Sequence, residues 1–468
     1  MSKTIVEQLD PIFKPESIAI IGASNNLAKW GGRIVNQILA SDFRGRIYPV
    51  NPHETKISGL KAYPDVLEIP DHVDLAIFTV RAAQMPGVMK NCVKKGIKGG
   101  VIISADFAET GEEGKALEEE TTRIARSGGL RFVGPNGNGI WTSAVGLNAW
   151  SMPKPIPGSL GFISQSGTFG GIATMTATMK GFGLSKFISI GNQADLKIAD
   201  YLEYLVQDDD TKVIAVYVEG MKDGRRFFES ALKVSKIKPI LIFKGGSSTL
   251  GARATLSHTA SIAGADNIFD AMCKQAGVIR VNEIEHLFIM AEALLNQPLP
   301  RGRRVAIIGS GGQGVALMDA LASLGIDAPE FTEDDKLRIK KLLPPHAPTP
   351  KNPVDFAAGG TETLGEVQVA EMLASIDYID GVITNVPTDR NYSAPSFFEQ
   401  RKALLTGLDI FCQIPNKYAK PVITQRWFVS EEVSEILRIA KIPMYNTPTE
   451  CARAMYGLVK YAEIKKRP

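Results

Sequence analysis

Cysteine is scarce in this sequence, and its spacing excludes familiar kinds of site. The 468 residues include 4 cysteines, and Cys92, Cys273, Cys412 and Cys451 lie far apart in the chain. They form no CxxC pair and no Cys/His spacing of the kind that binds zinc. We interpret them as small buried residues of a protein in a reducing compartment, and we expect no metal site.

Long apolar runs and an excess of charge of one sign are also missing. No stretch of about 18 or more apolar residues occurs, so we expect no membrane-spanning helix. Residues 1–24 contain no apolar signal core before the first strand-like run. The 53 basic residues nearly balance the 50 acidic ones, for a formal net charge of +3, which gives no reason to expect a nucleic-acid or membrane partner. We therefore expect a cytoplasmic protein.

The sequence does contain a regular alternation of short apolar runs and helix-compatible segments. The runs are rich in β-branched residues and do not alternate with polar ones, as expected for parallel strands buried on both faces. In the first part of the chain they occupy residues 17–24, 46–51, 73–80, 99–105 and 130–136. We predict an α/β protein with three tandem parallel-sheet domains, at residues 1–150, 151–298 and 299–468.

Three glycine-rich turns follow predicted strands and open predicted helices. They read "IAIIGASNN", "FISQSGTFGG" and "IIGSGGQGVALM". Such a turn presents backbone N–H groups and the positive end of a helix dipole to an anion. The first turn fits a nicotinamide dinucleotide poorly, because Ser24 takes the place of a fingerprint glycine and the second strand ends in Asn51 rather than in an acid. Each turn alone is compatible with plain architecture, but the three together favour phosphate chemistry.

One of the 5 histidines lies in an unusual setting. His258 is part of "GGSSTLGARATLSHTASIAG", a run of small residues that predicts a long mobile loop. A histidine can act as a covalent nucleophile when a carboxylate fixes its tautomer, and Glu219, at the end of "VIAVYVEG", is the candidate partner. The loop alone leaves a catalytic histidine and a hinge histidine equally open.

Longer motifs carry more information than any single turn. They include "SIAIIGASNN", "GGVIISADFAETGEEG", "GPNGNG", "PGSLGFISQSG", "SIGNQADLKIADYLEYL", "SHTASIAGAD" and "NPVDF". Together they resemble the α subunits of NDP-forming acyl-CoA synthetases, in particular ADP-forming acetate–CoA ligase, relatives of succinyl-CoA synthetase. The resemblance implies a Rossmann-like CoA-binding domain followed by two flavodoxin-like CoA-ligase domains. It also implies a reversible reaction in which acyl-CoA, phosphate and ADP give a carboxylic acid, CoA and ATP, through an acyl phosphate and a phosphohistidine.

The resemblance assigns roles to individual residues. It implies that His258 carries the phosphoryl group and that Glu219 steadies it. The implied phosphate-binding residues are Ser166, Gly167, Thr168, Gly311, Gly312 and Gly314. The implied CoA-binding residues are Gly22, Ala23, Ser24, Asn25, Lys29, Asn51, Pro52, Thr79, Val80, Ser104, Ala105 and Asn136. The implied neighbouring active-site residues are Asn352 and Asp355.

The resemblance also implies a partner. ADP or ATP, with Mg, is expected on a separate ATP-grasp β subunit, in an α2β2 assembly, because no ATP-grasp pattern follows the third predicted domain. Two departures from the family pattern leave the acyl group open: Gly137 and Asn138 replace the usual Cys and its neighbour in "GPNCxG", and Ala260 stands where glycine is common. Two other classes stay open, a non-catalytic CoA-binding or regulatory protein and, less well supported, an NAD-binding oxidoreductase.

Overall fold

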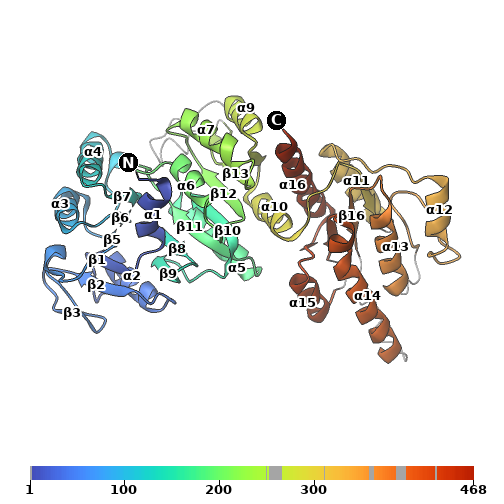
Figure 1. Cartoon of the computed structure of the whole chain (residues 1–468), viewed down its shortest axis with the longest axis horizontal. Helices are drawn as coiled ribbons and strands as arrows, with labels where there is room; N and C mark the ends of the chain where they lie inside the picture. Colours follow the sequence, from blue (N-terminus) through green and yellow to red (C-terminus); the bar gives the residue numbers. More distant parts are fainter. Residues whose placement is uncertain are drawn as a thin grey trace. The chain divides into compact units, whose positions relative to one another are not determined.

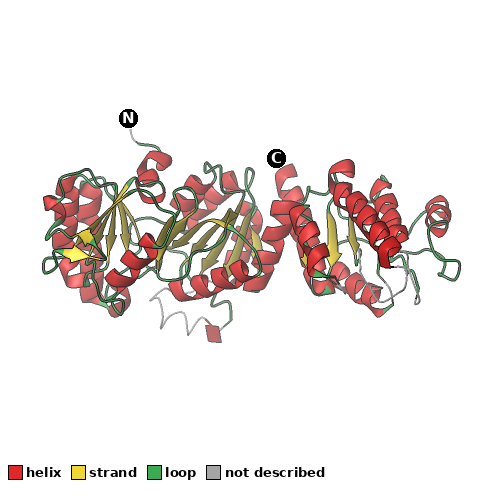
Figure 2. Cartoon of the chain, turned by 90° about the horizontal axis from the view of Figure 1, so that it is seen from below, coloured by secondary structure: helices red, strands yellow, loops and turns green. Residues whose placement is uncertain are grey.

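The computed structural model describes residues 3–248, 250–251, 266–309, 311–357, 363–385, 397–426 and 429–467. The chain forms two compact units, Met1–Ile284 and Glu285–Pro468 (Figure 1). Within each unit, helices lie on both sides of the strands (Figure 2). None of the described helices combines the length and the hydropathy that a membrane crossing requires.

The first sheet is parallel throughout and has the order β2-β1-β5-β6-β7. Its strands are β1 (Ser17–Ile21), β2 (Arg46–Val50), β5 (Leu75–Phe78), β6 (Gly99–Ile102) and β7 (Arg131–Val133). The other elements of this part are α1 (Ile5–Phe13), α2 (Trp30–Leu39), β3 (Lys56–Ile57), β4 (Leu60–Lys61), η1 (Val66–Glu68), η2 (Ala82–Gln84), α3 (Met85–Lys95), η3 (Ala108–Thr110) and α4 (Glu112–Ser127). The direction of winding reverses between β1 and β5, and ligands of open parallel sheets bind at the carboxyl ends of the strands beside such a point.

The second sheet has seven strands in the order β14-β13-β12-β10-β11-β8-β9. They are β8 (Gly139–Thr142), β9 (Leu147–Trp150), β10 (Pro157–Ser164), β11 (Leu184–Ser189), β12 (Val213–Val218), β13 (Ile240–Lys244) and β14 (Ile279–Val281). The associated helices are α5 (Gly167–Met179), α6 (Ile198–Leu205), α7 (Gly224–Val234) and α9 (Asp266–Ala276). Strands β10 to β14 are parallel, and their winding reverses between β10 and β12, so the carboxyl ends of these two strands are the expected ligand position.

The second unit contains one parallel sheet in the order β15-β16-β17-β18. Its strands are β15 (Val305–Ile307), β16 (Gly381–Thr384), β17 (Val422–Gln425) and β18 (Met444–Tyr445). Its helices are α10 (Ile284–Asn296), α11 (Gly312–Ser323), α12 (Glu333–Lys340), α13 (Thr363–Ser375), α14 (Phe397–Tyr418), α15 (Glu431–Ile439) and α16 (Pro448–Lys466). The predicted α/β class with parallel sheets is confirmed.

The central strands are buried along their whole length, as their apolar runs predict. Every residue of β1, β5, β11 and β12 is buried. This includes Lys186 in β11, whose ammonium group donates to Asp208 Oδ2 at 2.6 Å. A fully buried ammonium group is tolerated because an ionised partner compensates its lost hydration.

The hairpin of β8 and β9 joins the second sheet rather than the first. Strand β8 pairs antiparallel with β11, and Trp141 lies opposite Phe187. The chain therefore passes from the first sheet to the second before residue 150, where the sequence places the first domain limit. The limits at 150 and 298 stay predictions.

Candidate active site

The loops after β1, β5 and β6 and the turn after β7 are tied to one another at the carboxyl edge of the first sheet. Thr79 Oγ1 donates to the carbonyl oxygen of Ile21 at 3.0 Å, and Ser104 Oγ donates to that of Val80 at 2.5 Å. The backbone N–H of Asn136 donates to the carbonyl oxygen of Ser104 at 2.9 Å. These bonds hold the predicted CoA-binding residues of three loops in a fixed arrangement.

The "GPNGNG" turn follows β7 and continues into the second sheet. Asn136 has a φ of 58°, in the left-handed region that asparagine tolerates better than most residues. The backbone N–H of Asn138 donates to Ser189 Oγ at 2.7 Å, and its Oδ1 accepts from Ser151 Oγ at 2.5 Å. A Cβ atom on Gly137 would lie 2.6 Å from the carbonyl oxygen of Ser189. The glycine therefore lets this turn approach β11 closely, and a cysteine at this position would force the turn to move.

Helix α5 begins beside this turn. Ser166 is its N-cap, and the Ser166 Oγ accepts from the backbone N–H of Phe169 at 3.3 Å. The N–H groups of the first helical turn have no partner within the helix, so those of Gly167 and Thr168 are available to an anion at the positive end of the helix dipole. Asn138 Nδ2 donates to the carbonyl oxygen of Gly167 at 3.4 Å, which fixes the helix start against the turn.

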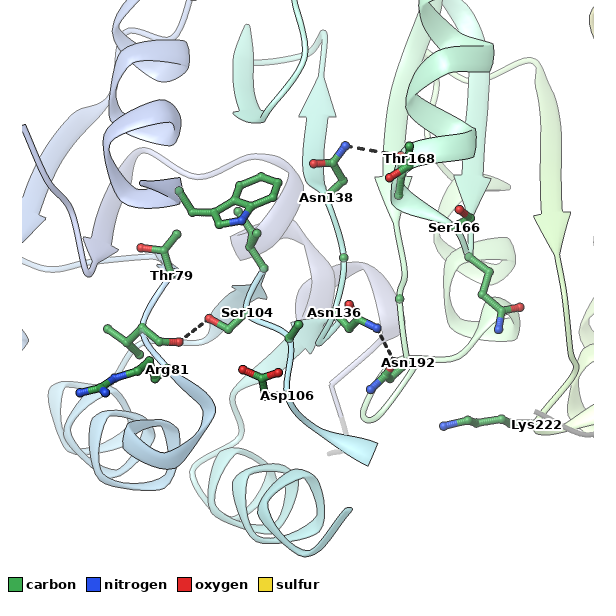
Figure 3. Close-up of a pocket in the computed structure, with 18 residues that line it drawn as sticks. Thr79, Arg81, Ser104, Asp106, Asn136, Asn138, Ser166, Thr168, Asn192 and Lys222 are labelled. Carbon is green, nitrogen blue, oxygen red and sulfur yellow. Dashed lines mark hydrogen bonds between the residues drawn. The ribbon is translucent and has the colours of Figure 1, made fainter. Parts of the chain in front are cut away.

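The two sets of loops enclose a cavity of about 360 Å³ (Figure 3). Thr79, Arg81 and Ser104 lie on one side of it, Ser166 and Thr168 lie on the other, and Asn136 and Asn192 lie between them. The predicted site residues that line it are Thr79, Val80, Ser104, Ala105, Asn136, Ser166, Gly167 and Thr168. The cavity thus joins the carboxyl edge of the first sheet to the start of α5 in the second.

Glu219 follows β12 and lies at the point where the winding of the second sheet reverses. Its side chain is buried, and Tyr217 Oη donates to Glu219 Oε1 at 3.1 Å. Burial and the neighbouring Glu219 carboxylate raise the pKa of Tyr217, so the phenol stays protonated as a donor. The backbone N–H groups of Glu219 and Gly220 donate to Gln165 Oε1 at 2.8 and 3.1 Å, and Gln165 lines the cavity directly before the α5 cap. His258 lies outside the described residues, so its pairing with Glu219 stays a prediction.

The remaining predicted CoA-binding residues follow β1 and β2 and do not line this cavity. They are Gly22, Ala23, Ser24, Asn25, Lys29, Asn51 and Pro52. Asn51 Nδ2 donates to the carbonyl oxygen of Ala23 at 2.8 Å, and Asn25 Nδ2 donates to that of Lys56 at 3.0 Å, so both amides hold loops together. Gly22 has a φ of 88°, and a Cβ atom there would lie 2.8 Å from Thr79 Oγ1. A direct contact of these residues with CoA stays a prediction.

The predicted residues of the second unit gather at the start of α11. Gly311 precedes the helix with a φ of 57°, and its N–H donates to Asp355 Oδ2 at 3.5 Å, so a carboxylate already lies at this helix start. Gly314 packs closely, since a Cβ atom there would lie 2.9 Å from the carbonyl oxygen of Gly309. Asn352 Oδ1 accepts from the Ile307 N–H at 2.9 Å, and its Nδ2 donates to the carbonyl oxygens of Val305 and Pro329 at 2.9 and 3.1 Å. In this geometry, the Asn352 amide holds the loop to β15.

Several residues of the cavity were not predicted from the sequence. Trp30, 41% exposed, lines it at the start of α2, and Arg81 and Lys222 are exposed cationic residues of its lining. The positions of Arg81 and Lys222 could have indicated them as site residues, because Arg81 directly follows the predicted Val80 and Lys222 lies three residues after the predicted Glu219. Asn192, which lies in the quoted motif "SIGNQADLKIADYLEYL", was also missed.

The fold and the cavity define a CoA-ligase class of protein. Residues 16–142 match the CoA binding domain family, and residues 157–294 match the succinyl-CoA ligase like flavodoxin domain. The first match covers the sheet whose loops form one side of the cavity, and the second covers α5 and β12 on the other side.

Similarity over the whole chain narrows the class to one family. The chain is 40% identical over 463 residues to the alpha subunit of acetate–CoA ligase [ADP-forming] II of Pyrococcus furiosus. The alignment covers 97% of this chain and 98% of that protein. It is 36% identical to acetate–CoA ligase [ADP-forming] II of Archaeoglobus fulgidus, over 98% of this chain and 68% of that protein. The fold also matches a solved structure, the dinucleotide forming acetyl-coenzyme A synthetase 1 of Ca. Korarchaeum cryptofilum in complex with phosphate and ADP. The two superpose with a TM-score of 0.86 at 33% identity, over 98% of this chain and 97% of that chain. The chain belongs to the ADP-forming acetate–CoA ligases, as a ligase alpha subunit, and the comparisons favour neither of the two alternative classes.

Proposed function

We propose that this chain binds CoA and phosphate in the described cavity, forms an acyl phosphate there, and transfers its phosphoryl group to His258. The observation that carries the proposal is the cavity itself, which brings the strand ends of a CoA-binding domain against the N-terminal end of α5. A phosphate at the start of α5 would gain hydrogen bonds from Gly167 and Thr168 and a favourable interaction with the helix dipole.

The first chemical step joins phosphate to the acyl group. A phosphate oxygen attacks the thioester carbonyl carbon of acyl-CoA, the carbon–sulfur bond breaks, and CoA leaves as a thiolate that takes up a proton. The α5 start favours this step because it holds the nucleophile and stabilises negative charge in one place. The products at the cavity are an acyl phosphate and free CoA.

The second step moves the phosphoryl group to the protein. A ring nitrogen of His258 attacks phosphorus, the bond between phosphorus and the acyl oxygen breaks, and the carboxylate leaves. Glu219 would accept the N–H of the other ring nitrogen and stabilise the imidazolium character that develops. Its rigid setting, between the Tyr217 hydroxyl and the Gln165 amide, suits such a fixed acceptor.

The third step needs a partner. We place ADP, with Mg, on a separate ATP-grasp β subunit in an α2β2 assembly, where phosphohistidine would phosphorylate ADP. Two similarities support a partner polypeptide: the Pyrococcus furiosus relative is named an alpha subunit, and the longer Archaeoglobus fulgidus relative extends beyond the region that matches this chain. The acyl group that we propose is that of a small carboxylic acid, acetate being the acid named in both relatives.

Ligand titration tests the binding half of the proposal. The purified chain is titrated with CoA and, separately, with NADH, and its melting temperature is followed. At a CoA concentration about 100 times Kd, binding adds about 2.7 kcal/mol to the stability of the folded state, which corresponds to a rise of about 5 °C for a unit of this size. A rise with NADH and none with CoA would refute the proposal in favour of the oxidoreductase alternative.

A further inference from the structure

Three side chains with no role in the proposed chemistry meet beside the cavity. Glu109 lies in η3, Glu118 in α4, and Asn192 in the loop after β11. Asn192 Nδ2 donates to Glu109 Oε2 at 2.5 Å and to Glu118 Oε2 at 2.8 Å. Asn192 Oδ1 accepts from Asn136 Nδ2 at 3.3 Å (Figure 3). We name Glu109, Glu118 and Asn192 the carboxylate–amide hub.

Chemistry fixes the orientation of the Asn192 amide. An ionised carboxylate only accepts hydrogen bonds, so two carboxylates on one side of Asn192 require its NH2 group there. A flipped amide would place the Asn192 oxygen against both carboxylates and would turn its NH2 group toward that of Asn136. The amide oxygen therefore faces Asn136, and it engages the Asn136 NH2 group.

The hub also joins the two sheets of the first unit. Glu109 Oε1 accepts from the backbone N–H of Asp106 at 2.8 Å, and Asp106 lines the cavity. From the second sheet, the backbone N–H of Asn192 donates to the carbonyl oxygen of Pro135 at 2.8 Å. Gly191 makes this approach possible, because a Cβ atom there would lie 2.0 Å from the same Pro135 oxygen. The hub therefore holds the cavity-lining turn of Asn136 from both sides.

We propose that the hub is a positioning device for CoA binding. Because the Asn136 NH2 group is engaged by Asn192, the Asn136 Oδ1 atom is left as the acceptor that the side chain presents at the cavity. An acceptor in this position suits an amide N–H donor, and the pantetheine arm of CoA carries such donors. Asn192 is then a positioning residue that acts through Asn136. This inference rests on the proposed function, because it takes CoA as the ligand.

Substitutions at Asn192 test the inference. Asn192→Asp replaces the donor with a third carboxylate, and Asn192→Ala removes the amide without adding charge. N192A takes away the acceptor that orients the Asn136 NH2 group, and N192D sets a third carboxylate against Glu109 and Glu118, which repel it. We therefore expect the Kd for CoA to rise about tenfold for N192D and about fivefold for N192A. Isothermal titration calorimetry with CoA measures both values. N192A keeps the test open to refutation if N192D does not fold.

A matched control and a double-mutant cycle separate positioning from general stability. Asn91 Nδ2 donates to Asp65 Oδ2 at 2.7 Å, and neither residue lines the cavity, so N91D should lower the melting temperature without changing the Kd for CoA. Asn136→Ala should weaken CoA binding by itself, and N192A should add less than a twofold change in that background, because coupled residues are not additive.

The outcomes are distinguishable. Wild-type Kd values for both Asn192 variants, or an unchanged effect of N192A in the N136A background, would overturn the positioning role and leave the proposed function standing. A wild-type chain that does not bind CoA would instead contradict the proposed function.

Discussion

Asp195 is a fully buried carboxylate of the first unit that pairs with two arginines, and its replacement gives a sharp prediction. Its side chain is 0% exposed, Oδ1 accepts from Arg126 Nε at 2.8 Å, and Oδ2 accepts from Arg131 Nε at 2.9 Å. Asp195 Oδ2 also accepts from the backbone N–H of Phe132 at 3.0 Å. The interaction joins α4 and β7 to the loop that carries Asn192, so its loss should affect both stability and CoA binding.

The expected magnitude follows from burial. Removing one partner of a buried ion pair costs about 3–5 kcal/mol. Arg126 is 54% exposed and contributes little, whereas Arg131 is 19% exposed, so we expect the lower end, about 3 kcal/mol, for Asp195→Asn. For a unit of this size, the loss corresponds to a fall of about 6 °C in the melting temperature.

The same substitution at an exposed ion pair is the control. Asp42 accepts from Lys154 Nζ at 2.6 Å, but the two side chains are 61% and 40% exposed. Exposed pairs of this kind contribute little to stability, so Asp42→Asn should lower the melting temperature far less than Asp195→Asn. Differential scanning calorimetry of the two variants and the wild type makes the comparison. A loss for D195N no larger than that for D42N would refute the reasoning from burial.

Three further predictions concern the cavity and the buried core. Arg81→Ala should raise the Kd for CoA about fivefold at low salt and less at 0.5 M KCl, because salt screens the attraction between this exposed cation and the CoA phosphates. Arg123→Ala, outside the cavity, should leave the Kd unchanged, and calorimetry at two salt concentrations measures both effects. Trp30→Phe should abolish the part of the tryptophan fluorescence change on CoA addition that comes from this partly exposed indole, and a spectrum unchanged by the substitution would remove Trp30 from the binding site. Burial opposes ionisation of Asp208, but hydrogen bonds from Lys186 and Thr211 hold its pKa below the usual value. The ionised Asp208 therefore stabilises the folded state above pH about 4, and this stabilisation is lost as the pH falls through the folded-state pKa. Asp208→Asn should therefore make the fall of the melting temperature between pH 5 and pH 2 smaller. A fall as large as that of the wild type would contradict the lowered pKa of Asp208.

The parts of the fold that the sequence predicts are those set by burial along a short segment. β1, β5 and β12 are runs of apolar residues because both faces of a central parallel strand are covered, and the runs are visible without a structure. The hairpin of β8 and β9 was not predicted. Its two four-residue strands lie at the edge of the second sheet, and β8 pairs there with β11, whose residues come 44 to 48 positions later in the chain.

In the candidate site too, residues with a local sequence pattern could be predicted, and residues placed by the packing of distant segments could not. The turns at Ser166 and Asn136 are recognisable because helix starts and tight turns use characteristic local residues. The contact of Asn192 with Glu109 and Glu118 has no local signature, because Glu109 lies in η3, Glu118 lies in α4 and Asn192 lies in the loop after β11 of the other sheet. Arg81 gave no signal beyond its place after a strand, and its position in the cavity depends on how the two sheets pack.

Phosphoryl transfer to His258 is the central claim, and covalent labelling tests it most directly. The purified chain is incubated with acetyl phosphate labelled at phosphorus, and protein-bound label is measured after acid and after base treatment. His258→Asn is compared with His53→Asn, a control on an exposed loop. The account predicts an acid-labile, base-stable label on the wild type and on H53N and none on H258N. Equal labelling of H258N and the wild type would contradict it.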